Sequence, residues 1–320
     1  MGTNATAERP AKRIKMLITN FKLRITNLRL RVCNSFFLFA LFLLSGNVFG
    51  QNLENFAEMI NRGSVEQKRA ALLHIRNLQT AEASRIAVSA LKDSSEIVRA
   101  TAVFSVIFLP KDEVLQLLTP LLADKKPLVR RETACALGKI GDSNAVNPLL
   151  QTFQKDKVLE VRNAAIVALG EIGDVATVAE LTKTLQRKPF AKEDFTRRSA
   201  AHSIGQIAQI RRTGKVTVLT PENFLPEKFK RIETPKYKNL SAQFPAFQTA
   251  AAILIRVLQN LKEADDVKRE AAFALGAIGD ESAIAVLQSN LNAEDYYLAE
   301  ICRESLLKFK RTETVHKSGN

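Results

Sequence analysis

Apolar residues recur at helical spacing through most of this chain, and the same pattern returns about every 31 residues. Three segments, 129–142, 161–174 and 267–280, share the run Val-(Arg/Lys)-x-x-(Ala/Thr)-x-x-Ala-Leu-Gly-x-Ile-Gly-Asp. Weaker copies begin at Gln67, Val98, Thr196 and Leu298. A repeat of this length predicts one supersecondary unit per copy, with successive units stacked on one another.

Two columns of the repeat have a fixed character. Four residues after each start stand the mostly small residues Ala71, Ala102, Thr133, Ala165, Ala200, Ala271 and Cys302. Eight residues after it stand the aliphatic residues Ile75, Val106, Leu137, Leu169, Ile204, Leu275 and Leu306. Positions four apart share a helix face, so each copy predicts a helix. Its small residues would let the next helix approach, and its aliphatic residue would fill the groove beside them.

A turn and a second helix follow in the clear copies. The turns are predicted at Gly141–Asp142, Gly173–Asp174 and Gly279–Asp280. Glycine ends a helix in the left-handed conformation, and the next aspartate caps the following helix by accepting from its free backbone N–H groups. Second helices are predicted over 145–153, 177–185 and 282–291, with 114–122 as the equivalent in the second copy. A single stretch, 215–220, could instead be a strand.

The predicted fold class is all-α: an α-solenoid of about seven stacked helical hairpins, forming a right-handed superhelix after an N-terminal signal or transmembrane segment. The shared run resembles the HEAT-like repeat family, in the short form first named from phycobilisome lyases. The resemblance covers residues 60–311 with one interruption. The first, second and seventh copies lack the Gly-Asp turn, which suits the ends of a solenoid. The resemblance implies the fold strongly and the function weakly.

The first fifty residues predict an export signal. The chain has a formal net charge of +14, about half of it within residues 1–35, and an uncharged stretch from 32 to 53 follows. The apolar centre, 36–44, precedes smaller residues at 48–50, which predicts cleavage after Gly50. An uncleaved signal anchor is the alternative, with membrane contact through residues 32–50. In either case the remaining chain is exported, to the periplasm or the extracellular space.

The repeat spacing doubles once, between the copies at 196 and 267, and this gap predicts an insertion. The domain order is a signal segment at 1–50, a lead-in at 51–63, repeats one to five at 64–210, the insertion at 211–246, the rest of repeat five with repeats six and seven at 247–311, and a polar tail at 312–320. The insertion would separate the two helices of repeat five.

The insertion differs in composition from the repeats. Residues 211–240 hold eight basic side chains against three acidic ones, so the repeats themselves are close to neutral. Prolines at 221, 226, 235 and 245 exclude a continuous helix. Its candidate partner-binding residues are Arg211, Arg212, Phe224, Lys228, Phe229, Lys230, Arg231, Lys236, Tyr237 and Lys238. Two interpretations are open: an arm that contacts an acidic or polymeric partner, or an insertion whose aromatics, including Phe244 and Phe247, pack on the solenoid.

A basic column runs through the repeats one residue after each start. Its members are Lys68, Arg99, Arg130, Arg162, Arg197 and Lys268. Such a row could bind phosphates. The favoured interpretation is an internal ladder, in which each cation pairs with an aspartate or a helix C-terminal carbonyl in a neighbouring turn, because Asp142, Asp174 and Asp280 recur with the same period. Each exposed pair would contribute about 0–1 kcal/mol.

Little in the sequence points to catalysis or to a cofactor. The three histidines, His74, His202 and His316, are scattered, and none is followed by Glu, so the His-Glu metal pairs of hydroxylases built on related repeats are missing. We expect His74 and His202 to be buried or partly buried structural residues. Cys135 and Cys302 occupy helix positions of the core. We therefore expect no catalytic residue, no bound metal and no cofactor.

These observations predict a non-catalytic, exported scaffold that binds a protein partner of unknown identity through the solenoid surface and the 211–246 insertion. Two alternatives come from the resemblance: an enzyme similar to the bilin-attaching lyases, and a HEAT-like protein that binds nucleic acid. The export signal opposes both, the near-neutral repeats also oppose nucleic-acid binding, and the repeat signature is shared by many proteins that are not enzymes.

Overall fold

The computed structural model describes residues 53–214 and 239–310. The chain divides into two compact units, 1–59 and 60–320, which are treated separately because their relative placement is not determined. Of the first unit only residues 53–59 are described, and they are helical. The predicted signal segment, the predicted strand at 215–220 and the polar tail all lie outside the described residues. In the part that is described, no helix is both long and apolar enough to cross a membrane.

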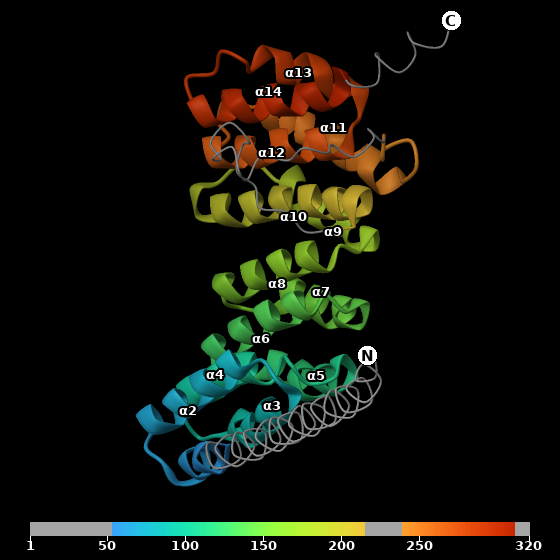
Figure 1. The fold of residues 1–320 in the computed structure, drawn as a ribbon. Coiled ribbons are helices and arrows are strands. Elements are labelled where there is room, and N and C mark those ends of the chain that lie inside the picture. Colours follow the sequence, from blue (N-terminus) through green and yellow to red (C-terminus); the bar gives the residue numbers. More distant parts are fainter. Residues whose placement is uncertain (1–52, 215–238, 311–320) are drawn as a thin grey trace, which may run out of the picture. The chain divides into compact units, whose positions relative to one another are not determined.

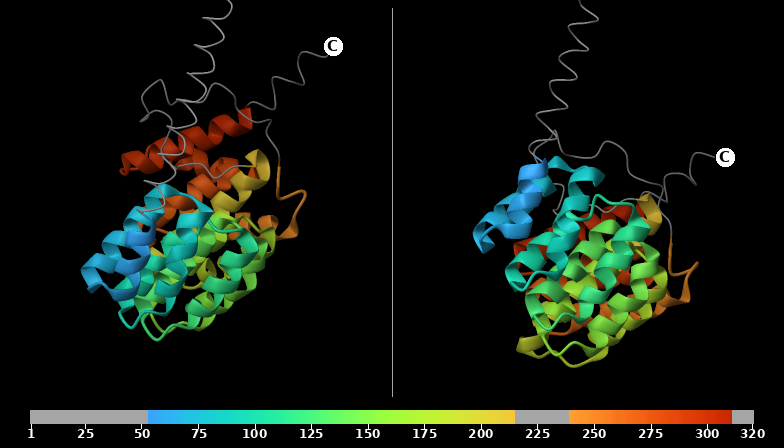
Figure 2. Two further views of the ribbon diagram at one scale, coloured as in Figure 1. Left: turned by 60° about the horizontal axis from the view of Figure 1, so that its bottom comes forward. Right: turned by 90° about the horizontal axis from the view of Figure 1, so that it is seen from below.

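Residues 60–320 contain the predicted hairpins, stacked in chain order (Figure 1), and Figure 2 shows the same order from two other directions. The first helices are α2 (Val65–Leu78), α4 (Glu96–Ser105), α6 (Pro127–Ile140), α8 (Leu159–Ile172), α10 (Asp194–Thr213), α12 (Asp265–Ile278) and α14 (Tyr296–Lys310). The second helices are α3 (Ala81–Ala87), α5 (Lys111–Leu118), α7 (Val146–Lys155), α9 (Val178–Gln186), α11 (Pro245–Gln259) and α13 (Ile284–Ser289). Each first helix from α4 to α12 packs between its predecessor and its successor, as α10 does between α8 and α12. The predicted all-α solenoid is confirmed.

The Gly-Asp turns adopt the predicted conformation. Gly141, Gly173 and Gly279 have φ values of 67°, 81° and 75°, in the left-handed region. The carboxylate of the following aspartate accepts the backbone N–H two residues on, at 2.8 Å for Asp142 and 2.9 Å for Asp174. Each aspartate caps a short 3₁₀ turn that leads into the second helix.

Both predicted core columns are buried in all seven repeats. A further pair of columns sets how closely repeats approach. A Cβ added to Gly138 would lie 2.7 Å from Cα of Ala168 in the next repeat, and one added to Gly170 would lie 2.7 Å from Cβ of Ser203. The Ser203 hydroxyl also donates to the carbonyl of Ile166, at 3.0 Å. Glycine in one repeat therefore faces a small residue in the next, because a larger side chain at either place would push the helices apart.

Two predictions about burial are wrong. His74 is exposed on α2, whereas the equivalent Ser105 is buried and donates to the carbonyl of Leu72 in the preceding repeat, at 2.9 Å. This position faces the preceding repeat, and within residues 60–320 repeat one has none. Cys135 is half-buried on α6 instead of in the core, while Cys302 is fully buried, as predicted.

The basic column forms an internal ladder, but with other acids than predicted. Lys68 pairs with Asp93 at 2.7 Å, Arg99 with Asp124 at 2.9 Å, and Arg130 with Asp156 at 2.6 Å. These aspartates follow the second helix of each hairpin and lie 25 or 26 residues beyond the cation. The aspartates of the Gly-Asp turns cannot serve, because they cap the opposite end of the hairpin.

The ladder changes in the later repeats. In repeat five Arg197 pairs with Glu263, across the whole insertion. In repeat six Arg269 takes the role predicted for Lys268 and pairs with Asp295 at 2.6 Å, while Lys268 pairs with Asp265 in its own helix. The hairpins thus have two chemically different edges. One carries the Gly-Asp turns, and the other carries the ladder acids.

Candidate functional site

The candidate site is the edge of Gly-Asp turns where the insertion leaves repeat five. Arg211 and Arg212, which were assigned to the insertion, lie in the last turn of α10. This helix has 20 residues against 14 in α8, and it ends at Gly214 with φ 70°. The second helix, α11, begins at Pro245. The insertion proper therefore begins after Thr213 and ends before Pro245, inside the bounds 211–246, and it connects the two helices of one repeat.

Both ends of the insertion are fixed to the end of α12. The guanidinium of Arg212 donates to the carbonyls of Gly276 and Ala277, at 3.1 and 3.2 Å. On the other side of the insertion, Leu240 is buried and its backbone N–H donates to the carbonyl of Ile278, at 2.9 Å. These carbonyls belong to the last turn of a helix and have no partner within it. The two ends of the insertion, which form its base, are therefore held on the solenoid by hydrogen bonds to α12.

Asp280 joins the turn of repeat six to the same base. Burial disfavours the ionised carboxylate, but hydrogen bonds from Ser282 and from Ser241 of the insertion base outweigh it, and the pKa of Asp280 lies below its usual range. Asp280 thus caps its own repeat and holds the returning chain.

The described aromatics of the insertion pack on the solenoid. Phe247 is fully buried, and Phe244 meets it edge to face with ring centroids 6.1 Å apart. The guanidinium of Arg211 lies over the Phe244 ring, 5.3 Å from its centroid. For these two aromatics the packing interpretation is confirmed. The remaining candidate residues, Phe224, Lys228, Phe229, Lys230, Arg231, Lys236, Tyr237 and Lys238, lie outside the described residues, and their role stays a prediction.

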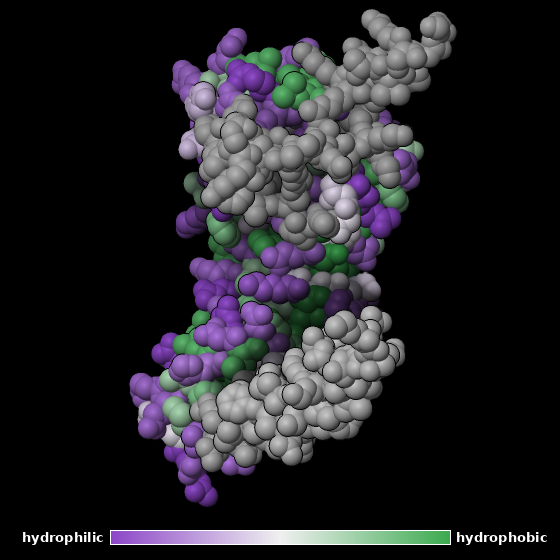
Figure 3. Space-filling model, viewed as in Figure 1, coloured by the Kyte–Doolittle hydropathy of each residue, from purple (hydrophilic) through white to green (hydrophobic). Residues whose placement is uncertain are grey.

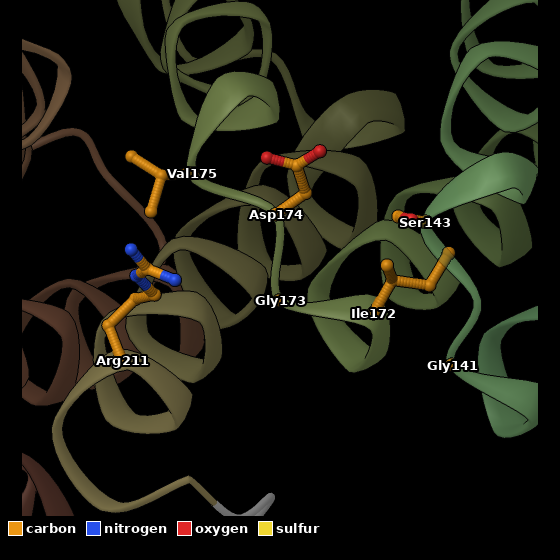
Figure 4. Close-up of a pocket in the computed structure, with 7 residues that line it drawn as sticks. All are labelled: Gly141, Ser143, Ile172, Gly173, Asp174, Val175 and Arg211. Carbon is orange, nitrogen blue, oxygen red and sulfur yellow. The ribbon is translucent and has the colours of Figure 1, made fainter.

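A pocket of about 300 Å³ opens on the same edge. The turns of repeats three and four and the end of α10 line it: Gly141, Ser143, Ile172, Gly173, Asp174, Val175 and Arg211. Figure 4 shows Arg211 and Val175 on one side, Ile172 and Ser143 on the other, and Asp174 between them. A Cβ on Gly173 would meet the Ile210 side chain at 2.8 Å, so this turn packs directly on α10. The pocket offers one cation and one carboxylate, which suits binding of a polar group.

The sequence did not indicate this pocket. The Gly-Asp turns were assigned a structural role and adopt the expected left-handed conformation, and their lining of a pocket depends on how three repeats stack. Arg211 was predicted as a binding residue, and the structure brings it to the pocket beside Asp174. One feature of the sequence could have indicated it: apolar residues continue at helical spacing for an extra turn at the end of α10.

The titratable residues elsewhere make structural contacts. His202 is partly buried, as predicted, and its Nδ1 lies 3.1 Å from Glu270. Burial raises the pKa of Glu171 on α8 above its usual range, although Lys139 and His202 oppose this. Within residues 53–214 and 239–310, no group of three or more His, Cys, Asp or Glu side chains could hold a metal ion.

The face seen in Figure 3 is mainly hydrophilic along the first helices, and apolar side chains show between the polar ones over α7 and α9.

The comparisons with known proteins agree with the repeats. The family described as HEAT repeats matches residues 84–169 and 115–205, and the PBS lyase HEAT-like repeat matches 267–293. No curated protein matches the sequence.

Solved structures of low identity are similar. Human deoxyhypusine hydroxylase in complex with glycerol is 19% identical, with 84% of this chain and 99% of that chain covered and a TM-score of 0.37. An engineered protein is 18% identical, covering 81% and 68%, with a TM-score of 0.47. The complex of CpcE and CpcF of phycocyanin lyase from Nostoc is 17% identical, covering 83% and 94%, with a TM-score of 0.44. Likeness at this level carries no argument about activity. On the matched residues and the stacked hairpins, the chain contains HEAT repeats, including a PBS lyase HEAT-like repeat.

Proposed function

We propose that this protein is a non-catalytic scaffold that binds a protein partner at the insertion base and the neighbouring turn edge. One observation carries the proposal: both ends of the insertion are fixed on α12 through Arg212 and Leu240, next to the pocket lined by Arg211. The two described ends of the insertion are thereby held at a defined place on the solenoid. Stacked repeats offer extended surfaces of this kind for partner binding.

The composition of the insertion indicates the class of partner. Its cations outnumber its acids by eight to three over residues 211–240. The partner surface is therefore expected to be acidic, because charge complementarity steers association and selects partners. Nucleic acid and a bilin substrate stay as rival ligands, and no observation on the described residues favours either.

The test replaces residues 215–238 with a Gly-Ser linker and leaves Arg212 and Leu240 in place. We expect a folded protein, by circular dichroism and melting temperature, that no longer captures its partner by cross-linking in native cells. A matched control exchanges Arg256, exposed on α11, for Asp and should capture as the wild type does. Unchanged capture by the linker variant would contradict the proposal.

We also propose that the scaffold works outside the cytoplasm, after export through residues 1–50. The support is the order of basic, apolar and cleavable segments in the sequence. Intact mass and fractionation of native cells test this. A species that begins at Gln51 in the exported fraction is expected, or a full-length species in the membrane fraction if the signal is an anchor. A cytosolic species starting near Met1 would overturn it.

A further inference from the structure

Three arginines of the ladder make the same set of contacts. This set is the rule of the ladder, and an arginine that makes all of it with its carboxylate partner forms a complete rung. Arg99, Arg130 and Arg197 each use Nε and Nη2 to hold both oxygens of a carboxylate at the end of their own hairpin, at 2.5–3.0 Å. Each also uses Nη1 to donate to a backbone carbonyl at the end of the preceding hairpin. For Arg99 and Arg130 this carbonyl belongs to the preceding ladder acid, Asp93 or Asp124, at 2.8 Å in both cases.

Repeat four breaks the rule because a cation stands where the acid should be. Arg197 donates through Nη1 to the carbonyl of Arg187, at 2.8 Å, which places Arg187 at the ladder-acid position of repeat four. The backbone agrees: Arg187 has φ −69° and ψ 156°, and Asp156 has φ −65° and ψ 137°. Both residues follow directly on the second helix of their hairpin.

Arg162 therefore keeps the backbone contact of the rule and lacks both contacts to a carboxylate. Its Nη1 donates to the carbonyl of Asp156 at 2.9 Å, as the rule requires. Among the described residues, no carboxylate lies within ion-pair distance of its guanidinium. Arg162 is half-buried and its guanidinium is held through Nη1, so its Nε and Nη2 stay available for a carboxylate from outside the chain.

The surroundings of this gap are basic and include an exposed aromatic ring. The side chain of Arg187 is 69% exposed, and its only ion pair in the described part is a long one of 4.0 Å to Glu193. Lys157 and Lys188 are also exposed next to the ladder positions. Phe190, three residues beyond Arg187, is 58% exposed. An arginine without a carboxylate partner in the described residues, an exposed arginine at the acid position, exposed lysines and an aromatic ring suit a carboxylate on a peptide.

We propose that repeat four binds an acidic peptide segment of a protein partner, one carboxylate of which completes the rung between Arg162 and Arg187. This inference rests on the proposed scaffold function and names a second contact for it. It is distinct from the insertion base: the gap lies at the start of α10 and the insertion at its end, about 30 Å apart along a 20-residue helix. A carboxylate is favoured over a phosphate because the same pair of nitrogen atoms holds carboxylates in the complete rungs.

The test measures fluorescence anisotropy of a labelled glutamate-rich peptide that contains leucine, with the full chain at low salt. Arg187→Asp supplies the missing acid from within the chain, and should weaken peptide binding by about tenfold or more, since a charge-assisted contact contributes about 1.5–3 kcal/mol. The same variant should melt at a higher temperature than the wild type. Arg162→Gln should also weaken binding, and serves if Arg187→Asp fails to fold. The control, Arg256→Asp, has the same change of charge on α11 and should leave binding within about twofold of the wild type.

Equal loss in Arg187→Asp and Arg256→Asp would overturn the inference, because binding would then follow net charge alone. The absence of peptide binding by the wild type would also overturn it. The same holds if single-stranded DNA binds more tightly than the peptide and Arg187→Asp weakens DNA binding as much as peptide binding. Partner capture in native cells separates this inference from the proposed function. Capture that needs residues 215–238 but is unaffected by Arg187→Asp would leave the scaffold function standing and refute the fourth-rung contact. If the wild type captures no protein at all, the scaffold function fails.

Discussion

Arg197 and Glu263 lie 66 residues apart in the sequence and form a bidentate ion pair in which both side chains are almost completely buried. Equivalent pairs in the earlier repeats join residues 25 or 26 apart. The pair therefore closes repeat five as an ordinary hairpin, although the insertion separates its two helices. The rest of the Arg197 guanidinium is satisfied by backbone carbonyls, including that of Thr184 at 3.1 Å.

Breaking this pair should destabilise the protein strongly. Glu263→Gln removes the negative charge and leaves the Arg197 guanidinium buried with no counter-ion, so we expect a loss of about 3–5 kcal/mol in the free energy of unfolding. Urea denaturation followed by circular dichroism measures it. The matched control is Glu113→Gln, which breaks the surface pair with Arg85, whose side chain is 60% exposed. That change should cost about 0–1 kcal/mol. Similar losses of unfolding free energy in the two variants would show that the buried Arg197 pair matters no more for stability than an exposed pair.

Gly173 and Gly141 provide a second comparison, because both occupy left-handed turns but only one touches a neighbouring helix. Alanine at either position should cost about 1–2 kcal/mol for the backbone conformation alone. At Gly173 the added Cβ would also meet Ile210 at 2.8 Å, whereas at Gly141 the nearest atom is 4.0 Å away. Gly173→Ala should therefore lose a further amount of about 1–3 kcal/mol. Thermal unfolding of both variants measures the difference, and equal melting temperatures would contradict the packing of this turn on α10.

The glycine turns and the apolar columns could be predicted from the sequence because both depend on local geometry. Helical spacing fixes which residues share a face, and a left-handed helix end favours glycine whatever surrounds it. The ladder partners could not be read from the 14-residue run, since they stand after the second helix. A signal was present, because Asp93, Asp124 and Asp156 recur at the repeat spacing outside that run.

The candidate site was less accessible to such reasoning. Arg211 was identified from composition alone, but the pocket that it lines needs turns from two other repeats. The role of Arg187 was missed, because an arginine in a basic stretch shows nothing unusual until the hydrogen bond from Arg197 places it at an acid position. Sites formed by stacking depend on contacts between repeats, and the sequence periodicity gives the repeats without those contacts.

The ladder aspartates should make stability depend on acid pH. Burial disfavours ionisation of Asp156, but hydrogen bonds from Arg130 and the backbone N–H of Val158 outweigh it and hold its pKa below the ordinary value of 3.8. The same balance lowers the pKa of Asp93, Asp124 and Asp295. Between the lowered pKa of the folded state and the ordinary pKa, the unfolded state binds more protons than the folded state. The stability that these aspartates contribute is therefore complete at pH values above the ordinary pKa and is lost as the pH falls through the pKa values of the folded state.

Asp156→Asn tests this dependence. The variant should be less stable near neutral pH by about 1–3 kcal/mol, because Arg130 loses its charged partner. Its stability should also fall less steeply than that of the wild type between about pH 5 and pH 3. The control, Glu294→Gln, changes an exposed side chain and should follow the wild-type curve. Urea midpoints at several pH values measure both effects, and parallel curves for Asp156→Asn and the wild type would contradict the assignment.

The two described cysteines should differ in reactivity, because they differ in burial. Burial raises the pKa of Cys302 to about 12, and burial with the nearby carboxylates Glu132 and Glu171 also raises the pKa of the half-buried Cys135. Since the thiolate is the reactive form, iodoacetamide at about pH 8 should modify native Cys302 very slowly and Cys135 faster. Peptide mass spectrometry after timed labelling measures each site, and labelling in urea gives the reference for full exposure.

Repeat seven has no second helix within the described residues, so rapid labelling of native Cys302 would show that α14 opens readily from α12. The hydrogen bond from Ser305 to the carbonyl of Ala272 indicates that α14 is held on repeat six. We therefore expect slow labelling of native Cys302, close to the rate of global unfolding.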